Sequence, residues 1–214
     1  MKKIDLNQKI VPYFREKYPL PKTELEYIDL YQLTVSVILS AQCTDKRVNI
    51  ITKDFFNKLP DFKALSRADY PDVFQLIKSC SYPNNKTKHL MALAKTLIEN
   101  YDGKIPSEVE EMQKLPGIGR KSANVIAAVG FNQNTMPVDT HVFRVSQRIG
   151  LVTKSKTPLE VEKKLIALIP ENLLPDFHHW LILHGRYVCK ARKPGCVKCG
   201  LTTVCNYFIS ERSG

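Results

Sequence analysis

The sequence predicts an all-α protein. No segment shows the sustained two-residue alternation of apolar and polar side chains that a half-buried strand needs. Apolar residues recur at helical spacing instead, and glycine and proline mark short connections between the helical segments. The length of 214 residues, 43% of them hydrophobic, is enough for one large or two small cores.

The expected helices follow one another along most of the chain. The segment from Leu30 to Gln42 is apolar on most faces, which suits a central buried helix. The segment from Ser107 begins with a cap residue, and Thr157 with Glu160 has the spacing of a capping box. The other expected helices span residues 45–57, 72–79, 85–101, 120 to about 130, 140–148 and 176–188.

Charge and cysteine content indicate the partner and the compartment. Lys and Arg number 32 against 21 Asp and Glu, a net charge of +11 that favours a polyanion such as DNA, RNA or an acidic membrane surface. No stretch reaches the ~18 apolar residues of a membrane span, so we expect no membrane association, a cytoplasmic location and reduced cysteines. Cys43 and Cys80 lie in apolar segments and are interpreted as buried, inert thiols.

The other four cysteines are gathered near the C-terminus. Their spacing is C-x6-C-x2-C-x5-C, and they are Cys189, Cys196, Cys199 and Cys205. Four thiolates this close in sequence can hold one iron–sulfur cluster or one tetrahedral zinc ion. The spacing differs from common zinc fingers and from the bacterial ferredoxin run, and it favours a cluster without excluding zinc.

The segment from Leu115 to Gly130, LPGIGRKSANVIAAVG, predicts a helix–hairpin–helix. Pro116 and Gly117 break the preceding helix, Gly119 permits a turn that a β-carbon resists, and a new helix starts at about Arg120. Backbone N–H groups at such a helix start can bind a phosphate. The motif is therefore expected to bind the DNA backbone without sequence specificity. The alternative is a turn that only joins two core helices.

Lys121 and Asp139 are the candidate catalytic residues. Lys121 opens a helix that is apolar on nearly every face, so we expect partial desolvation and the helix N-terminus to lower its pKa and favour a nucleophilic amine. The alternative is an ordinary lysine that contacts phosphate. Asp139 is placed to cap the following helix, and the same rigid carboxylate could stabilise positive charge on a sugar that is losing its base.

Together the segments LSAQCTDKRVN, LPGIGRKSA, VDTHVFRV and HGRYVCKARKPGC resemble the endonuclease III family over essentially the whole chain. These are DNA glycosylases and apurinic/apyrimidinic (AP) lyases of base-excision repair. The resemblance implies that Lys121 is the nucleophile, that Asp139 is the catalytic aspartate, and that the four C-terminal cysteines hold one [4Fe-4S] cluster. It also implies a helical barrel over residues 23–133, a cluster domain made of residues 1–22 and 134–214, and an active site in the cleft between them.

The resemblance further implies a monomer that acts on double-stranded DNA with damaged bases or abasic sites, close to the bacterial nucleoid. Gln42 would enter the gap left by a flipped base. Tyr82 would be the wedge, although its loop, SYPNNKT, departs from the common G-F-Y-x-N-K-A pattern. The expected DNA contacts are Gln42, Tyr82, Leu115, Gly117, Ile118, Gly119, Arg120, His141, Lys190, Arg192 and Lys193.

The implied activity is the removal of oxidised pyrimidines, followed by strand cleavage 3′ to the abasic site through a lysine Schiff base. Three alternatives stand beside it. A monofunctional adenine or mismatch glycosylase would lack the amine that Lys121 supplies. A redox-active DNA-binding protein would use the cluster and only touch phosphate with Lys121, and a zinc-stapled DNA-binding module would carry no cluster.

Overall fold

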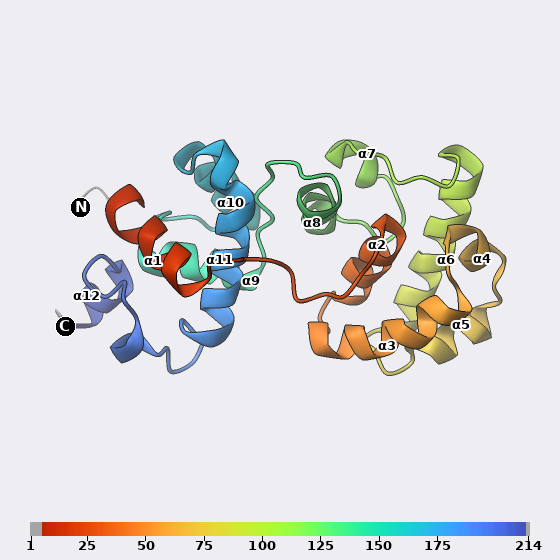
Figure 1. The fold of residues 1–214 in the computed structure, drawn as a ribbon, viewed down its shortest axis with the longest axis horizontal. Helices are drawn as coiled ribbons and strands as arrows, with labels where there is room; N and C mark the ends of the chain where they lie inside the picture. The colour runs from red at the N-terminus through yellow and green to blue at the C-terminus, as the bar shows by residue number, and fades with distance from the viewer. Residues whose placement is uncertain (1–5, 213–214) are drawn as a thin grey trace. The chain divides into compact units, whose positions relative to one another are not determined.

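The computed structural model describes residues 6–212, and over this range it is helical with no strand (Figure 1). The all-α prediction is therefore confirmed. The chain divides into two compact units: one is Glu24–Gln133, and the other combines the N-terminal segment up to Thr23 with the C-terminal segment from Asn134. No helix among the described residues is long and apolar enough to cross a membrane.

The unit Glu24–Gln133 is organised around a buried helix. Its helices are α2 (Leu30–Leu39), α3 (Asp45–Lys58), α4 (Phe62–Arg67), α5 (Tyr70–Ile77), α6 (Pro83–Asn100), α7 (Val109–Met112) and α8 (Arg120–Gly130). Helix α2 packs against α3, α6 and α8, and all its residues from Leu33 to Leu39 are buried. Helix α6 packs against α4 and α5 (Figure 1). The central buried helix expected at Leu30 is confirmed.

Two helix ends in this unit differ from the predictions. Helix α2 ends at Leu39 rather than at Gln42, because Gln42 takes a left-handed conformation with φ 54°. Helix α7 begins after Glu108, which forms no side-chain cap, so the prediction that Ser107 caps it is wrong. The short helix α4 was not predicted, since six residues give too little periodicity to be seen in sequence.

The unit made from both chain ends has a separate core. Its helices are α1 (Val11–Lys17), α9 (Thr140–Ile149), α10 (Pro158–Leu168), α11 (Leu174–Tyr187) and α12 (Asn206–Arg212), with short turns η1 (Leu6–Ile10), η2 (Glu171–Leu173) and η3 (Cys196–Lys198). Thr157 caps α10 as predicted, accepting a hydrogen bond from the Glu160 amide at 3.2 Å.

An aromatic cluster joins the N-terminal segment to the rest of this second unit. The rings of Phe14 and Trp180 stack with centroids 5.7 Å apart, and Phe177 meets Trp180 edge-on at 5.3 Å. The indole N–H of Trp180 donates to the Tyr18 carbonyl at 3.0 Å. Because aromatic burial contributes strongly to core stability, α1 is fixed against α11 although they are far apart in sequence.

Candidate active site

The turn between α7 and α8 has the geometry of the predicted hairpin, but the position that requires glycine is Gly117. Gly117 has φ +79°, and a β-carbon there would lie 2.8 Å from the β-carbon of His89. Both facts exclude a larger residue. Gly119 has φ −84° in extended backbone, with nothing within 4 Å of a built β-carbon. The expectation that Gly119 provides a turn closed to other residues is wrong, because its conformation is an ordinary one.

Leu115 and Ile118 anchor the hairpin in the core. Each is 3% exposed, and the Ile118 amide donates to the Leu115 carbonyl at 3.2 Å. Their side chains are buried, so any DNA contact by these two predicted residues is confined to their backbone. Gly119 and Arg120, which follow, are exposed.

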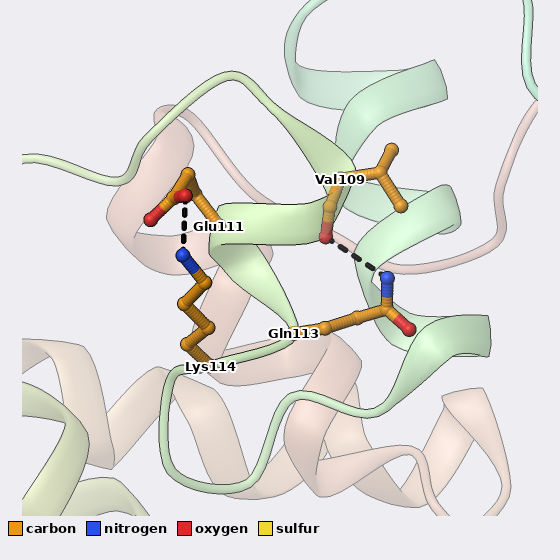
Figure 2. A network of polar contacts seen from close by, with 4 residues as sticks. All are labelled: Val109, Glu111, Gln113 and Lys114. Atoms are coloured by element: carbon orange, nitrogen blue, oxygen red, sulfur yellow. Dashed lines mark hydrogen bonds and ion pairs between the residues drawn. The ribbon is translucent and has the colours of Figure 1, made fainter.

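The short helix before the turn is braced by its own side chains. Figure 2 shows the Lys114 ammonium paired with the Glu111 carboxylate. It also shows the side-chain amide of Gln113, which donates to the Val109 carbonyl at 3.2 Å. The hydrogen bond and negative charge of Glu111 raise the pKa of the exposed Lys114. Lys114 therefore stays charged beside the hairpin.

Lys121 lies in the first turn of α8, after an N-cap residue, Gly119, that makes no side-chain cap. The first N–H groups of a helix lack intrahelical partners, so this end of α8 favours an anion. The Lys121 side chain is exposed. The partial desolvation expected from its apolar helix is not found, because the apolar residues from Ala123 to Ala128 face the core while Lys121 does not.

Gln42 and Tyr82 lie on two loops of the same unit that touch each other. Both side chains are exposed, and both residues are left-handed, with φ 54° and 55°. The Ser81 hydroxyl donates to the Gln42 carbonyl at 2.5 Å. Such conformations are costly for residues other than glycine and persist only where neighbouring contacts impose them.

Lys86 holds much of the backbone of these two loops in place, and its role was not predicted from the sequence. It is 5% exposed, and its ammonium donates to the carbonyls of Leu39 at 2.8 Å and Ala41 at 2.7 Å. It thereby satisfies carbonyls at the C-terminal end of α2. The signal was present, because residue 86 is in register with Leu90, Leu93 and Leu97 on the apolar face of α6.

Asp139 is the N-cap of α9, as predicted. Its carboxylate accepts a hydrogen bond from the Val142 amide at 2.7 Å, and the side chain is half-buried. His141, two residues further on, is also half-buried, and burial lowers its pKa. The cap holds one carboxylate oxygen of Asp139 in a fixed direction.

Two arginines on α9, also missed from sequence, tie this helix to the cysteine segment. Arg144 donates to the Cys189 carbonyl at 3.2 and 3.1 Å. Arg148 donates to the carbonyls of Lys190 at 2.7 Å and Ala191 at 3.0 Å, and it lies over the Tyr207 ring at 4.6 Å. Asp139 and the cysteine segment are therefore connected through a single helix.

The structure brings the four C-terminal cysteines around one small cavity. No three His, Cys, Asp or Glu side chains of the described residues converge enough to hold a single metal ion. Tetrahedral zinc needs four ligands about 2.3 Å from one point, whereas a cluster spreads its cysteines over several irons. Four sulfur donors around one cavity are a donor set that an iron–sulfur cluster or a zinc ion can use.

The loop between the first two cysteines is cationic. Lys190, Arg192 and Lys193 are exposed on it, and Lys193 is left-handed with φ 50°. Its backbone is held by Arg148, so the cations are presented from a fixed support.

Comparison with known proteins agrees with this geometry. Residues 35–171 match the model of the HhH-GPD superfamily base excision DNA repair proteins. Endonuclease III of Rickettsia felis is 46% identical over 94% of each chain. Endonuclease III of Bacillus subtilis is 40% identical over 94% of this chain and 93% of its own. A solved structure of a trapped endonuclease III–DNA covalent intermediate superposes with a TM-score of 0.90 at 37% identity, covering 94% of this chain and 95% of that one.

The fold and the hairpin thus define a base-excision repair protein of the helix–hairpin–helix class. At this identity and coverage, the chain belongs to the endonuclease III family. It is a bifunctional DNA glycosylase and AP lyase.

Proposed function

We propose that the chain removes oxidised pyrimidines from double-stranded DNA and cleaves the strand 3′ to the abasic site, with Lys121 as nucleophile. The observation that carries this proposal is an exposed amine in the first turn of α8, directly after the glycine-containing hairpin. A monofunctional glycosylase has no need of such an amine.

The first step is access to the lesion. A damaged base inside a duplex is out of reach, so the nucleotide is flipped out of the stack. The hairpin backbone at Gly117 and Gly119 would hold a phosphate at the start of α8. Gln42 would fill the gap in the duplex and Tyr82 would wedge the strands apart. Their fixed left-handed backbones support these roles because rigid loops lose little entropy on binding.

The chemistry follows from an amine placed beside a sugar. The neutral Lys121 amine attacks C1′, and the base leaves with the electrons of the glycosidic bond. The attached amine loses a proton, and the C1′–O4′ bond of the sugar opens, with O4′ taking up a proton, to leave an imine. The imine acidifies the C2′ proton. Removal of that proton expels the 3′ phosphate, and water then hydrolyses the imine to release Lys121.

Asp139 would stabilise the positive charge that develops on the sugar as the base departs. Its hydrogen bond from the Val142 amide supports this role, because a carboxylate fixed in advance needs no reorganisation during reaction.

Cys189, Cys196, Cys199 and Cys205 would hold one [4Fe-4S] cluster; the support is that all four line one cavity and that the chain belongs to the endonuclease III family. The bound group would supply a structural cross-link for the segment that carries Lys190, Arg192 and Lys193. These three cations would meet DNA phosphates. We expect a monomer that works on chromosomal DNA in the bacterial cytoplasm.

Borohydride trapping on a duplex with an abasic site tests the proposal. Wild type should become covalently attached to DNA, and Lys121→Gln should not, because glutamine cannot form an imine. Lys114→Gln is a matched control, since Lys114 is also an exposed lysine of the hairpin region, and it should still be trapped. Undiminished trapping of Lys121→Gln would show that another amine is the nucleophile.

A further inference from the structure

The two cysteines outside the C-terminal segment, interpreted from the sequence as buried and inert, differ in their burial. Cys80 is 4% exposed, whereas Cys43 is only half-buried and open to small solutes. The Lys86 ammonium bridges their surroundings, because it donates both to the carbonyl of Ala41, two residues before Cys43, and to the Cys80 sulfur. The Cys43 thiol is also close enough to affect the pKa of Cys80. The pair lies between two loops of the unit Glu24–Gln133, one after α2 and one before α6.

A buried cation completes the cluster. The Lys86 ammonium donates to the Cys80 sulfur at 3.1 Å, in addition to its bonds to Leu39 and Ala41. An ammonium has three N–H donors, so each donor has one acceptor. The Cys80 thiol itself donates to the Leu39 carbonyl at 3.3 Å. The site therefore contains two thiols and an ammonium whose acceptors are two carbonyls and a sulfur. These groups are the components of thiol redox chemistry.

We propose that Cys43 and Cys80 are an oxidisable dithiol, which a hydroperoxide converts into a disulfide joining the loop after α2 to the loop before α6.

The accessible thiol reacts first. The Cys43 thiolate attacks one oxygen of hydrogen peroxide, and hydroxide leaves to give a sulfenic acid. The Cys80 sulfur then attacks the Cys43 sulfur and water leaves. In sum, two thiols and one peroxide give one disulfide and two waters. Burial raises the pKa of Cys80, and the bond from Lys86 offsets part of that rise, so Cys80 suits the second step rather than the first.

The reaction needs little movement of the backbone. The Ser81 hydroxyl already joins the loops through the Gln42 carbonyl, and the Lys86 ammonium joins them through the Ala41 carbonyl and the Cys80 sulfur. The disulfide would therefore fix the backbone beside both Gln42 and Tyr82. It would also close the chain between residues 43 and 80, which restrains the unfolded state.

Peptide mapping of the intact full-length protein tests the proposal. The protein is treated with hydrogen peroxide, its remaining thiols are alkylated, and it is digested with trypsin without reductant. We expect peptides 23–46 and 79–86 to appear as one species, two hydrogens lighter than their sum. Dithiothreitol should separate them. The oxidised protein should also unfold at a higher urea concentration than the reduced protein.

Cys43→Ser is the matched control, because position 43 is half-exposed and serine is a close substitute there. This variant should give no linked species and no rise in urea midpoint. Recovery of Cys43 and Cys80 as separate alkylated or sulfinic peptides in wild type would overturn the proposal. So would a link from Cys43 to a C-terminal cysteine in place of Cys80.

Discussion

The two units of the chain are stabilised by different means. In Glu24–Gln133 a continuous apolar core surrounds α2, and its buried charge, Lys86, donates to two carbonyls and a thiol. In the other unit the segment after α11 adds little to the core: Leu201 is buried, but Val197 is 97% exposed. Bonds from Arg144 and Arg148 hold this segment instead.

This difference shows where the chain depends on a bound group. A segment with so few buried apolar side chains cannot offset the entropy of ordering its backbone by burial alone. The four cysteines that line its cavity supply the missing constraint if they bind a cluster. The unit with Lys121 has no such dependence.

The largest expected effect comes from removing one cluster ligand. Cys199→Ser should lose the visible colour and most of its iron, starting from about four irons per chain. The C-terminal tail should become sensitive to protease and DNA binding should weaken, while the helices of Glu24–Gln133 remain. Absorption spectra, iron analysis and limited proteolysis measure these effects.

Cys43→Ser is the control, a half-buried cysteine in the other unit, and it should keep its colour. A colourless wild type with one tight zinc and full glycosylase activity would contradict the cluster assignment. It would leave the catalytic assignment intact.

The next effect separates the two roles of Asp139. Asp139→Asn should lower the rate of base removal by ~10²-fold, a typical cost of losing charge stabilisation in a transition state. The melting temperature should change little, since asparagine caps about as well as aspartate. Single-turnover kinetics and thermal melts measure both.

Asp61→Asn is the matched control, because Asp61 caps α4 through the Ala64 amide at 2.7 Å and has no catalytic role in this account. It should leave the rate unchanged. A strongly destabilised Asp139→Asn with near-normal kinetics would reduce Asp139 to a cap.

Much of this organisation could be predicted from the sequence. The hairpin, the cap at Asp139 and the buried α2 depend on local patterns, namely glycine spacing, cap residues and apolar periodicity. The partners of Lys86, Arg144 and Arg148 could not be assigned, because they are backbone carbonyls far away in sequence, although the register of Lys86 on α6 indicates its burial. The exposure of the Lys121 side chain could not be predicted from the sequence either, since it depends on which way the first turn of α8 faces.

Acid should affect the unit made from both chain ends through His179. Burial, with a smaller contribution from Arg186, lowers its pKa to about 4 from 6.5. Between pH 6.5 and 4 the His179 imidazole is protonated in the unfolded chain but not in the folded chain. The free energy of unfolding therefore falls as the pH drops from 6.5 toward 4. We expect His179 to contribute a loss of about 2 kcal/mol between pH 7 and pH 5. His184 on the same helix adds to this loss, because burial lowers its pKa to about 4 as well.

Urea unfolding followed by fluorescence measures this loss, because the chain's single tryptophan, Trp180, lies on the same helix. His179→Gln should make the pH dependence shallower, with the remainder due to His184. An equally steep dependence in that variant would assign the effect to other groups.

The smallest effect concerns the cationic loop. Binding to undamaged DNA should weaken with salt by a slope of about −0.9 per phosphate contacted. Replacing Arg192 and Lys193 by alanine should reduce the slope by about one unit for each phosphate that the loop no longer meets. Lys163→Ala, at an exposed lysine of α10 outside the predicted contacts, should leave it unchanged. Equal slopes for all three proteins would show that the loop does not meet phosphate.

The most direct test of the account locates the atom that attacks the sugar. Wild type trapped on abasic DNA with borohydride is digested with nuclease and then with trypsin. Alkylated Lys121 resists trypsin, so peptide 121–144 carrying a sugar remnant should replace peptide 122–144 in mass spectra. A sugar remnant on any other lysine or on the chain terminus, with peptide 122–144 unchanged, would contradict Lys121 as the nucleophile.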